Sequence, residues 1–154
     1  MMASPEERLA ELGITLPTPI APVANYVPLA RTGNLLIVSG QLPMVNNQLF
    51  AIGRLGEEVD VETGKKAAYY CMINIIAQVK AELGDLSKVK KLVRLGGFVS
   101  GTPNFTQQAT IINGASDLAV EVFGDAGRHA RAAVGVASLP LGACVEVEAM
   151  FEVE

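Results

Sequence analysis

The chain has 154 residues, of which half are apolar and 18% are charged, a composition typical of a single globular domain and not of a disordered segment. Its formal net charge of −4 argues against a standing nucleic-acid-binding surface. Two cysteines are too few for a disulfide scaffold and fit a reducing compartment. No apolar run approaches the roughly 18 residues of a membrane span, and the N-terminus lacks the pattern of a signal peptide. We therefore expect a cytoplasmic protein.

The first 23 residues are expected to form a short helix and a proline-rich lead-in. Ser4 is a suitable N-cap, Pro5 suits the first helical position, and Gly13 ends the helix. Three prolines between residues 16 and 22 then require an extended backbone. This segment leads into the first strands.

Strands and one long helix are predicted over the middle of the chain. Apolar runs at 27–31 and 35–39, joined by a Gly-Asn turn, predict a β-hairpin. A third strand is expected near 48–52. Between residues 63 and 83 the apolar side chains recur at helical spacing, and Gly84 ends this helix.

The next predicted element is a strand over 89–99, which Gly96-Gly97 interrupts. A second helix is predicted after it, beginning at Thr102-Pro103 and ending at Gly124. With two closing strands, this order predicts an α+β sandwich with one mixed sheet and two helices on one face. The strands carry apolar residues on both sides, so the other face also needs a cover, which a symmetric oligomer would supply. No repeat or linker divides residues 1–154, and we expect a single domain.

The closing strands contain the most unusual charges of the chain. Residues 131–140 and 144–149 are expected to fold into a hairpin that places Arg131 opposite Glu146. Because unpaired burial of an arginine is expensive, Arg131 either pairs with Glu146 across the hairpin or binds a ligand carboxylate. Glu148, two residues further on, is expected on a solvated face.

Other polar side chains are expected to be structural. His129 is the only histidine, which excludes multi-histidine metal sites; a loop position is favoured, with acid–base chemistry left open. Cys71 is expected in the core, and Lys90-Lys91 with Arg94 at a solvated strand end. The glycines show neither the P-loop nor the dinucleotide fingerprint, so no nucleotide cofactor and no metal are expected.

Three separated motifs carry a resemblance to a known family. Residues 130–140 are A-R-A-A-V-G-V-A-S-L-P and residues 145–149 are V-E-V-E-A, close to the patterns A-R-x-x-V-x-V-x-x-L-P and V-E-I-E-A. Upstream, Asn25-Tyr26 and Ser39-Gly40-Gln41-Leu42-Pro43 match an early tyrosine and an S-G-Q-x-P element, and Asn113 fits a V-N position. Over residues 24–153 the chain resembles the RidA (YjgF) family, also called endoribonuclease L-PSP or reactive intermediate deaminase.

The resemblance implies a chorismate-mutase-like α+β fold assembled as a homotrimer, with each active cleft between neighbouring subunits. It also implies hydrolysis of reactive 2-imino acids, the tautomers of enamines, to 2-keto acids and ammonia without a cofactor or metal. Arg131 would hold the substrate carboxylate, and Glu146, ionised in a cleft next to arginine, would orient or deprotonate water. Residues that would line the pocket or donate backbone N–H groups are Tyr26, Ser39, Gly40, Asn113 and Ala133.

The sequence also departs from the family pattern. Ala133 stands where many members have cysteine, and Gly135 replaces a commonly charged residue. The N-terminal helix and the 45–61 segment exceed the compact members. Two other functions stay open: a non-catalytic binder or sensor of small carboxylates that uses the same arginine, and a ribonuclease. The acidic charge, the lone His129 and the lack of an aromatic–basic surface count against the ribonuclease.

Overall fold

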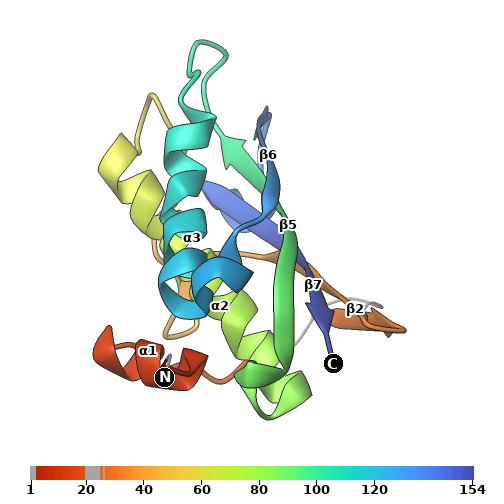
Figure 1. Cartoon of the computed structure of the whole chain (residues 1–154). Coiled ribbons are helices and arrows are strands. Elements are labelled where there is room, and N and C mark those ends of the chain that lie inside the picture. Colours follow the sequence, from red (N-terminus) through yellow and green to blue (C-terminus); the bar gives the residue numbers. More distant parts are fainter. Residues whose placement is uncertain (1–2, 20–24, 26) are drawn as a thin grey trace.

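The computed structural model describes residues 3–19, 25 and 27–154 and has the α+β architecture that the sequence predicts. In Figure 1 the long helices α2 and α3 pack on one face of a twisted sheet. The helices and strands in chain order are α1 (Pro5–Glu11), β1 (Leu29–Thr32), β2 (Leu35–Gln41), β3 (Met44–Val45), β4 (Gln48–Leu49), α2 (Val61–Leu83), β5 (Val89–Ser100), α3 (Gln108–Phe123), β6 (Ala130–Val136) and β7 (Val145–Val153). Three short 3₁₀ turns are η1 (Leu86–Lys88), η2 (Gly124–Gly127) and η3 (Pro140–Gly142).

The main sheet has five strands in the order β1-β2-β7-β5-β6. All neighbours are antiparallel except β5 and β6, which are parallel and joined through α3 as a crossover helix. The predicted hairpin of the last two strands is therefore wrong, since β5 lies between β6 and β7. The connection instead contains η3, where Leu141 and Gly142 both have positive φ and turn the chain across the end of β5.

Local signals at the ends of the helices account for most of their boundaries. Ser4 and Glu7 form a reciprocal capping box at the start of α1, and Gly84 caps α2 at a φ of 78°. The second long helix starts later than predicted, at Gln108, because residues 102–105 form a turn closed by a bond from Phe105 N to Thr102 O. The strand expected at 48–52 is shortened to β4, which pairs only with β3.

Strand β5 runs through its two glycines without the predicted interruption. Gly96 pairs with Ala132 and Glu148 on its two sides, and Gly97 pairs in the same way with β6 and β7. A Cβ at Gly97 would overlap the side chain of Ile112 on α3. The glycine is thus explained by the close approach of a helix to the sheet, and the ladder stays intact.

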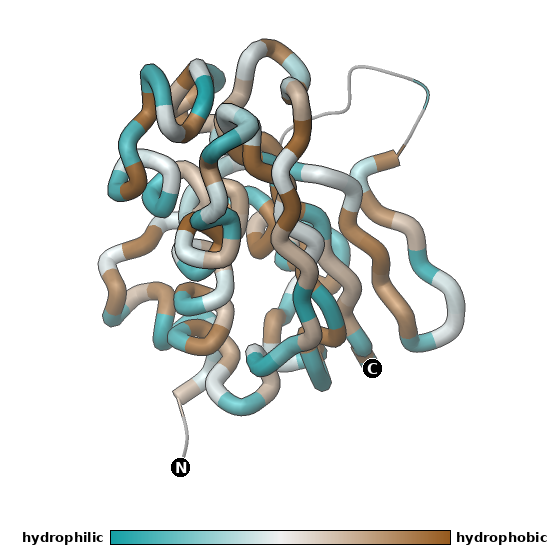
Figure 2. The backbone as a smooth tube through the Cα atoms, turned by 90° about the horizontal axis from the view of Figure 1, so that it is seen from above, coloured by the Kyte–Doolittle hydropathy of each residue, from teal (hydrophilic) through white to brown (hydrophobic). Residues whose placement is uncertain are grey.

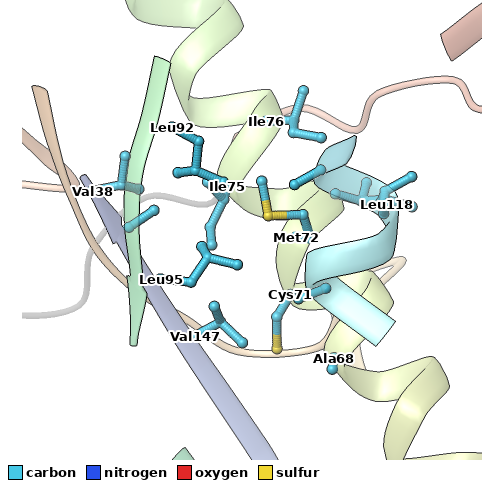
Figure 3. Packing of buried hydrophobic residues seen from close by; sticks show 14 of the residues in the cluster. Val38, Ala68, Cys71, Met72, Ile75, Ile76, Leu92, Leu95, Leu118 and Val147 are labelled. Carbon is cyan, nitrogen blue, oxygen red and sulfur yellow. The ribbon is translucent and has the colours of Figure 1, made fainter. Parts of the chain in front are cut away.

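Helix α2 is the centre of the hydrophobic core, and residues 71–79 are buried on every side. Figure 3 shows Met72 and Ile75 of α2 packing between the sheet residues Leu95 and Val147 and the α3 residue Leu118. Cys71 lies in this core as predicted, with its Sγ 3.8 Å from the carbonyl oxygen of Val145. The helices therefore cover the centre of one face of the sheet.

The opposite face of the sheet, which we call the outer face, is partly apolar and carries no helix among the described residues. Ile37, Met150 and Phe98 are half-buried there, and Val134 is 45% exposed. Figure 2 shows hairpin β1–β2 at one edge of the molecule, with hydrophobic positions running along β2. The outer face is the one for which the sequence predicts an oligomeric cover.

Candidate functional site

Arg131 lies on the edge strand β6 and points toward α3. Its Nη1 donates to Oδ1 of Asn113 at 2.7 Å and to Oγ of Ser116 at 3.1 Å. These two acceptors are three residues apart, so they lie on the same face of α3. Among the described residues, Nε and Nη2 of Arg131 have no hydrogen-bond partner, which leaves donors free for a ligand carboxylate.

His129 extends this arrangement by one more side chain. Its Nδ1 is 2.6 Å from the carbonyl oxygen of Gly127, and its Nε2 is 2.8 Å from Ser116 Oγ. Because a carbonyl only accepts, Nδ1 donates to Gly127, and in the neutral ring Nε2 accepts from the Ser116 hydroxyl. The Ser116 oxygen then accepts from Arg131, so all the donors and acceptors match. His129 lies outside helix and strand, as predicted, but it also supports the arginine.

Ala133, two residues beyond Arg131, lies on the same side of β6. Arg131 pairs with Leu95 of β5 and Ala133 pairs with Gly97, and both of these β5 residues face the helices. Ala133 is half-buried against the core. We call Arg131, Ala133, Asn113 and Ser116 the arginine half-site.

Glu146 lies on β7 and faces the other way. It pairs with Phe98 of β5, on the outer face of the sheet. Its carboxylate rests against Gly40, where a Cβ would overlap it. The β2–β7 register shifts between Val38 and Gln41, so Ser39 and Gly40 form a bulge beside this carboxylate. The hydroxyl of Ser39 donates to the carbonyl oxygen of Val27 at 3.0 Å. We call Glu146, Ser39 and Gly40 the carboxylate half-site.

The charges near Glu146 differ from the prediction. Burial, and then the charge of Glu148 two residues along, raise the pKa of Glu146 above its ordinary value. Arg131, expected to keep it ionised, is not its neighbour. Glu148 is not simply solvated either, because its Oε2 lies 3.2 Å from Nη1 of Arg94. The pair joins β5 to β7 beside Gly96, where an added Cβ would lie 2.9 Å from both side chains.

Arg131 and Glu146 therefore lie on opposite faces of one sheet, and the predicted pairing across a hairpin is wrong. The physical reason is the register, which places Arg131 level with Leu95 and Glu146 level with Phe98, three residues along the same strand. Each half-site is assembled, but one copy of the chain does not bring the two together. Tyr26, predicted to line the pocket, lies outside the described residues.

Sequence reasoning missed Ser116 and the role of His129. The only available signal was the spacing of Ser116, three residues after Asn113 on a predicted helix. In the part of the chain that the structure describes, no three His, Cys, Asp or Glu side chains gather as a possible metal site. None of the described helices combines the length and the apolar character needed to cross a membrane.

The sheet is mixed and five-stranded, contains a β-α-β crossover and carries two long helices on one face. With an arginine held from the crossover helix, this arrangement defines a chorismate-mutase-like α+β protein. A family model described as YjgF/chorismate mutase-like, putative endoribonuclease, matches residues 6–153, so the chain belongs to this family. The resemblance that the motifs indicated is thereby confirmed.

Three relatives illustrate the range of this family. Protein TCP17 of Trypanosoma cruzi is 49% identical over 145 residues, covering 94% of this chain and 91% of that protein. The crystal structure of Atu1372 from Agrobacterium tumefaciens, a protein of unknown function, is 52% identical with a TM-score of 0.92, covering 97% of this chain and 92% of that one. RidA from the Antarctic bacterium Psychrobacter sp. PAMC 21119 is 26% identical with a TM-score of 0.62, covering 90% and 96%.

Proposed function

We propose that the protein hydrolyses reactive 2-imino acids and their enamine tautomers to 2-keto acids and ammonia. The observation that carries the proposal is the arrangement of Arg131, whose Nη1 is fixed by Asn113 and Ser116 while its other donors have no partner in the part of the chain that the structure describes. A planar guanidinium held in this way suits a carboxylate ligand. A charged hydrogen bond to that carboxylate is worth about 1.5–3 kcal/mol, or one to two powers of ten in affinity.

The chemistry needs one water and one carboxylate besides the arginine. The imine carbon is electrophilic, so the main tasks are to position the substrate and to accept a proton from the attacking water. Glu146 takes a proton from water as the water oxygen adds to this carbon, and returns that proton to the imine nitrogen, so the adduct bears one hydroxyl and one amino group. Glu146 then moves the hydroxyl proton to the amino nitrogen, the C–N bond breaks, and ammonia leaves as the carbonyl of the keto acid forms. A raised pKa suits a carboxylate that both accepts and returns a proton.

We further propose that the active site is shared between copies of the chain in a homotrimer. Arg131 and Glu146 face opposite sides of the sheet, so the arginine half-site of one copy would meet the carboxylate half-site of its neighbour. The half-buried and exposed apolar side chains of the outer face support such an assembly, because association would remove them from water. In this proposal Tyr26 lines the shared cleft, and the site needs no cofactor or metal.

The test is to generate 2-iminobutyrate in situ and to follow its disappearance with and without the protein. We expect wild-type protein to accelerate the loss and Arg131→Ala to lower kcat/KM by at least about tenfold, since a charged hydrogen bond is removed. Arg128→Ala is the matched control, because Arg128 is an exposed arginine paired only with Asp125 among the described residues. Equal rates for wild type and Arg131→Ala would refute the proposal.

A non-catalytic carboxylate binder would use the same arginine half-site. It would bind 2-oxobutanoate, lose that binding on Arg131→Lys, and not change the rate of imine loss. The same assay therefore separates a binder from an enzyme.

A further inference from the structure

A pocket of about 490 Å³ opens at the C-terminal end of β6, beyond the arginine half-site. This volume falls within the range of about 300–1,000 Å³ that is usual for small-molecule sites. We call it the side-chain pocket. Its walls include Arg54, Pro103, Phe105, Gln108, Gly135 and Val136.

The side-chain pocket lies further along β6, the strand that carries Arg131. Alternate residues of a strand share a face, so Arg131, Ala133 and Gly135 form one row on β6, and all three pair with helix-facing residues of β5. Helix α3 runs beside this row in Figure 1. On α3, Asn113 contacts Arg131, whereas Gln108 lies next to Gly135. These two α3 residues are separated by about 7.5 Å along the helix axis.

We propose that the side-chain pocket binds the side chain of the substrate and selects 2-imino acids with bulky, uncharged side chains. This inference rests on the function proposed above and concerns the substrate class of the same site. With the carboxylate at Arg131, the substrate side chain would extend along β6 toward Gly135, and at about 1.5 Å per carbon–carbon bond a longer side chain reaches further toward the pocket than a methyl or ethyl group.

The lining favours an uncharged side chain. Phe105, Pro103 and Val136 supply apolar walls. Arg54 also lines the pocket, but its Nε and Nη2 both donate to Oε2 of Glu57, at 3.2 and 3.0 Å. Its charge is thus balanced by Glu57, and its aliphatic stem and Nη1 are the parts left, among the described residues, to contact a ligand. A second carboxylate on the substrate would have to compete with Glu57 for this arginine.

Gly135 sets the depth of the pocket. A Cβ at this position would lie 3.1 Å from Nε2 of Gln108, the end of a flexible side chain that donates to the carbonyl oxygen of Phe105 at 2.8 Å. The backbone φ of Gly135 is not in the left-handed region, so a larger residue can be placed there without backbone strain. A leucine at residue 135 would project into the space that the substrate side chain is proposed to occupy.

The experiment compares kcat/KM for imines formed in situ by an amino-acid oxidase from 2-aminobutyrate, leucine and glutamate. We expect wild type to prefer the leucine-derived imine over both others. Gly135→Leu should lower the ratio of the leucine-derived to the 2-aminobutyrate-derived rate by at least about tenfold, the usual effect of filling an apolar subsite. Gly135→Ala should lower the ratio less, and Gln108→Ala, which widens the pocket, should not lower it.

Two results would overturn the inference. One is a wild-type protein that treats the ethyl or the acidic imine as well as the leucine-derived imine. The other is a Gly135→Leu variant, folded by circular dichroism, that loses activity on both substrates equally. If wild type turns over no imine, the proposed function fails, and the pocket is then tested by measuring the binding of 2-oxobutanoate and 4-methyl-2-oxopentanoate by calorimetry. Gly135→Leu must lower the affinity for 4-methyl-2-oxopentanoate more than the affinity for 2-oxobutanoate, or the pocket does not bind side chains.

Discussion

Replacing Ser116 by alanine tests how the protein holds its arginine. The Ser116 oxygen accepts from Nη1 of Arg131 at 3.1 Å and lies 2.8 Å from Nε2 of His129. The substitution removes one charged hydrogen bond, worth about 1.5–3 kcal/mol where no other bond remains. The shorter bond to Asn113, at 2.7 Å, is kept and still restrains the guanidinium. We therefore expect the lower end of that range, which corresponds to about a tenfold loss in kcat/KM.

The assay distinguishes a loss of positioning from a general loss of structure. Kinetics of Ser116→Ala are measured on a 2-imino acid and on its methyl ester, which has no carboxylate charge for Arg131 to bind. We expect the loss with the acid, mainly in KM, and little change with the ester. His129→Gln keeps a side chain that can hydrogen-bond Ser116 and should lose less than His129→Ala. Equal losses on acid and ester would refute the idea that Ser116 acts through Arg131.

Two further substitutions test the outer face and the core. Glu148→Gln removes a negative charge that raises the pKa of Glu146, so Glu146 should stay ionised at lower pH. The acidic limb of the profile of kcat/KM against pH should therefore move to lower pH, and an unchanged limb would contradict this. Gly97→Ala would place a Cβ against Ile112 and should lower the free energy of unfolding by about 1–3 kcal/mol in urea titrations; unchanged stability would show that α3 has room to shift.

The elements that the sequence predicts well are those marked by local chemistry. Ser4, Pro5 and Gly13 delimit α1 because capping bonds and backbone preferences act within a few residues. The long α2 helix follows from its apolar spacing and its glycine stop. Strand pairing is different, since it depends on residues far apart in the chain. The short connection between β6 and β7 favoured a hairpin, whereas the preceding β-α-β order already favoured a parallel crossover.

The same distinction applies to the site. Motif resemblance identified Arg131, Asn113 and Glu146, and the structure joins the first two by a hydrogen bond. The resemblance could not reveal that Glu146 faces the other side of the sheet, because the register of the strands decides which face of the sheet a side chain occupies. The link through Ser116 to His129 also needs three-dimensional proximity between a helix and the loop before β6. The homotrimer, the cytoplasmic location, the catalytic roles and the lack of a cofactor stay predictions.

The central claim is that each active site combines Arg131 of one copy with Glu146 of another, and mixing two inactive variants tests it most directly. Arg131→Ala and Glu146→Gln proteins are unfolded together, refolded in equal amounts and assayed for imine hydrolysis. If sites are shared, random assembly restores both groups in about one quarter of them, so about one quarter of wild-type activity should return. Each variant refolded alone should stay inactive. If the mixture is no more active than the two variants alone, the two residues do not act in one shared site.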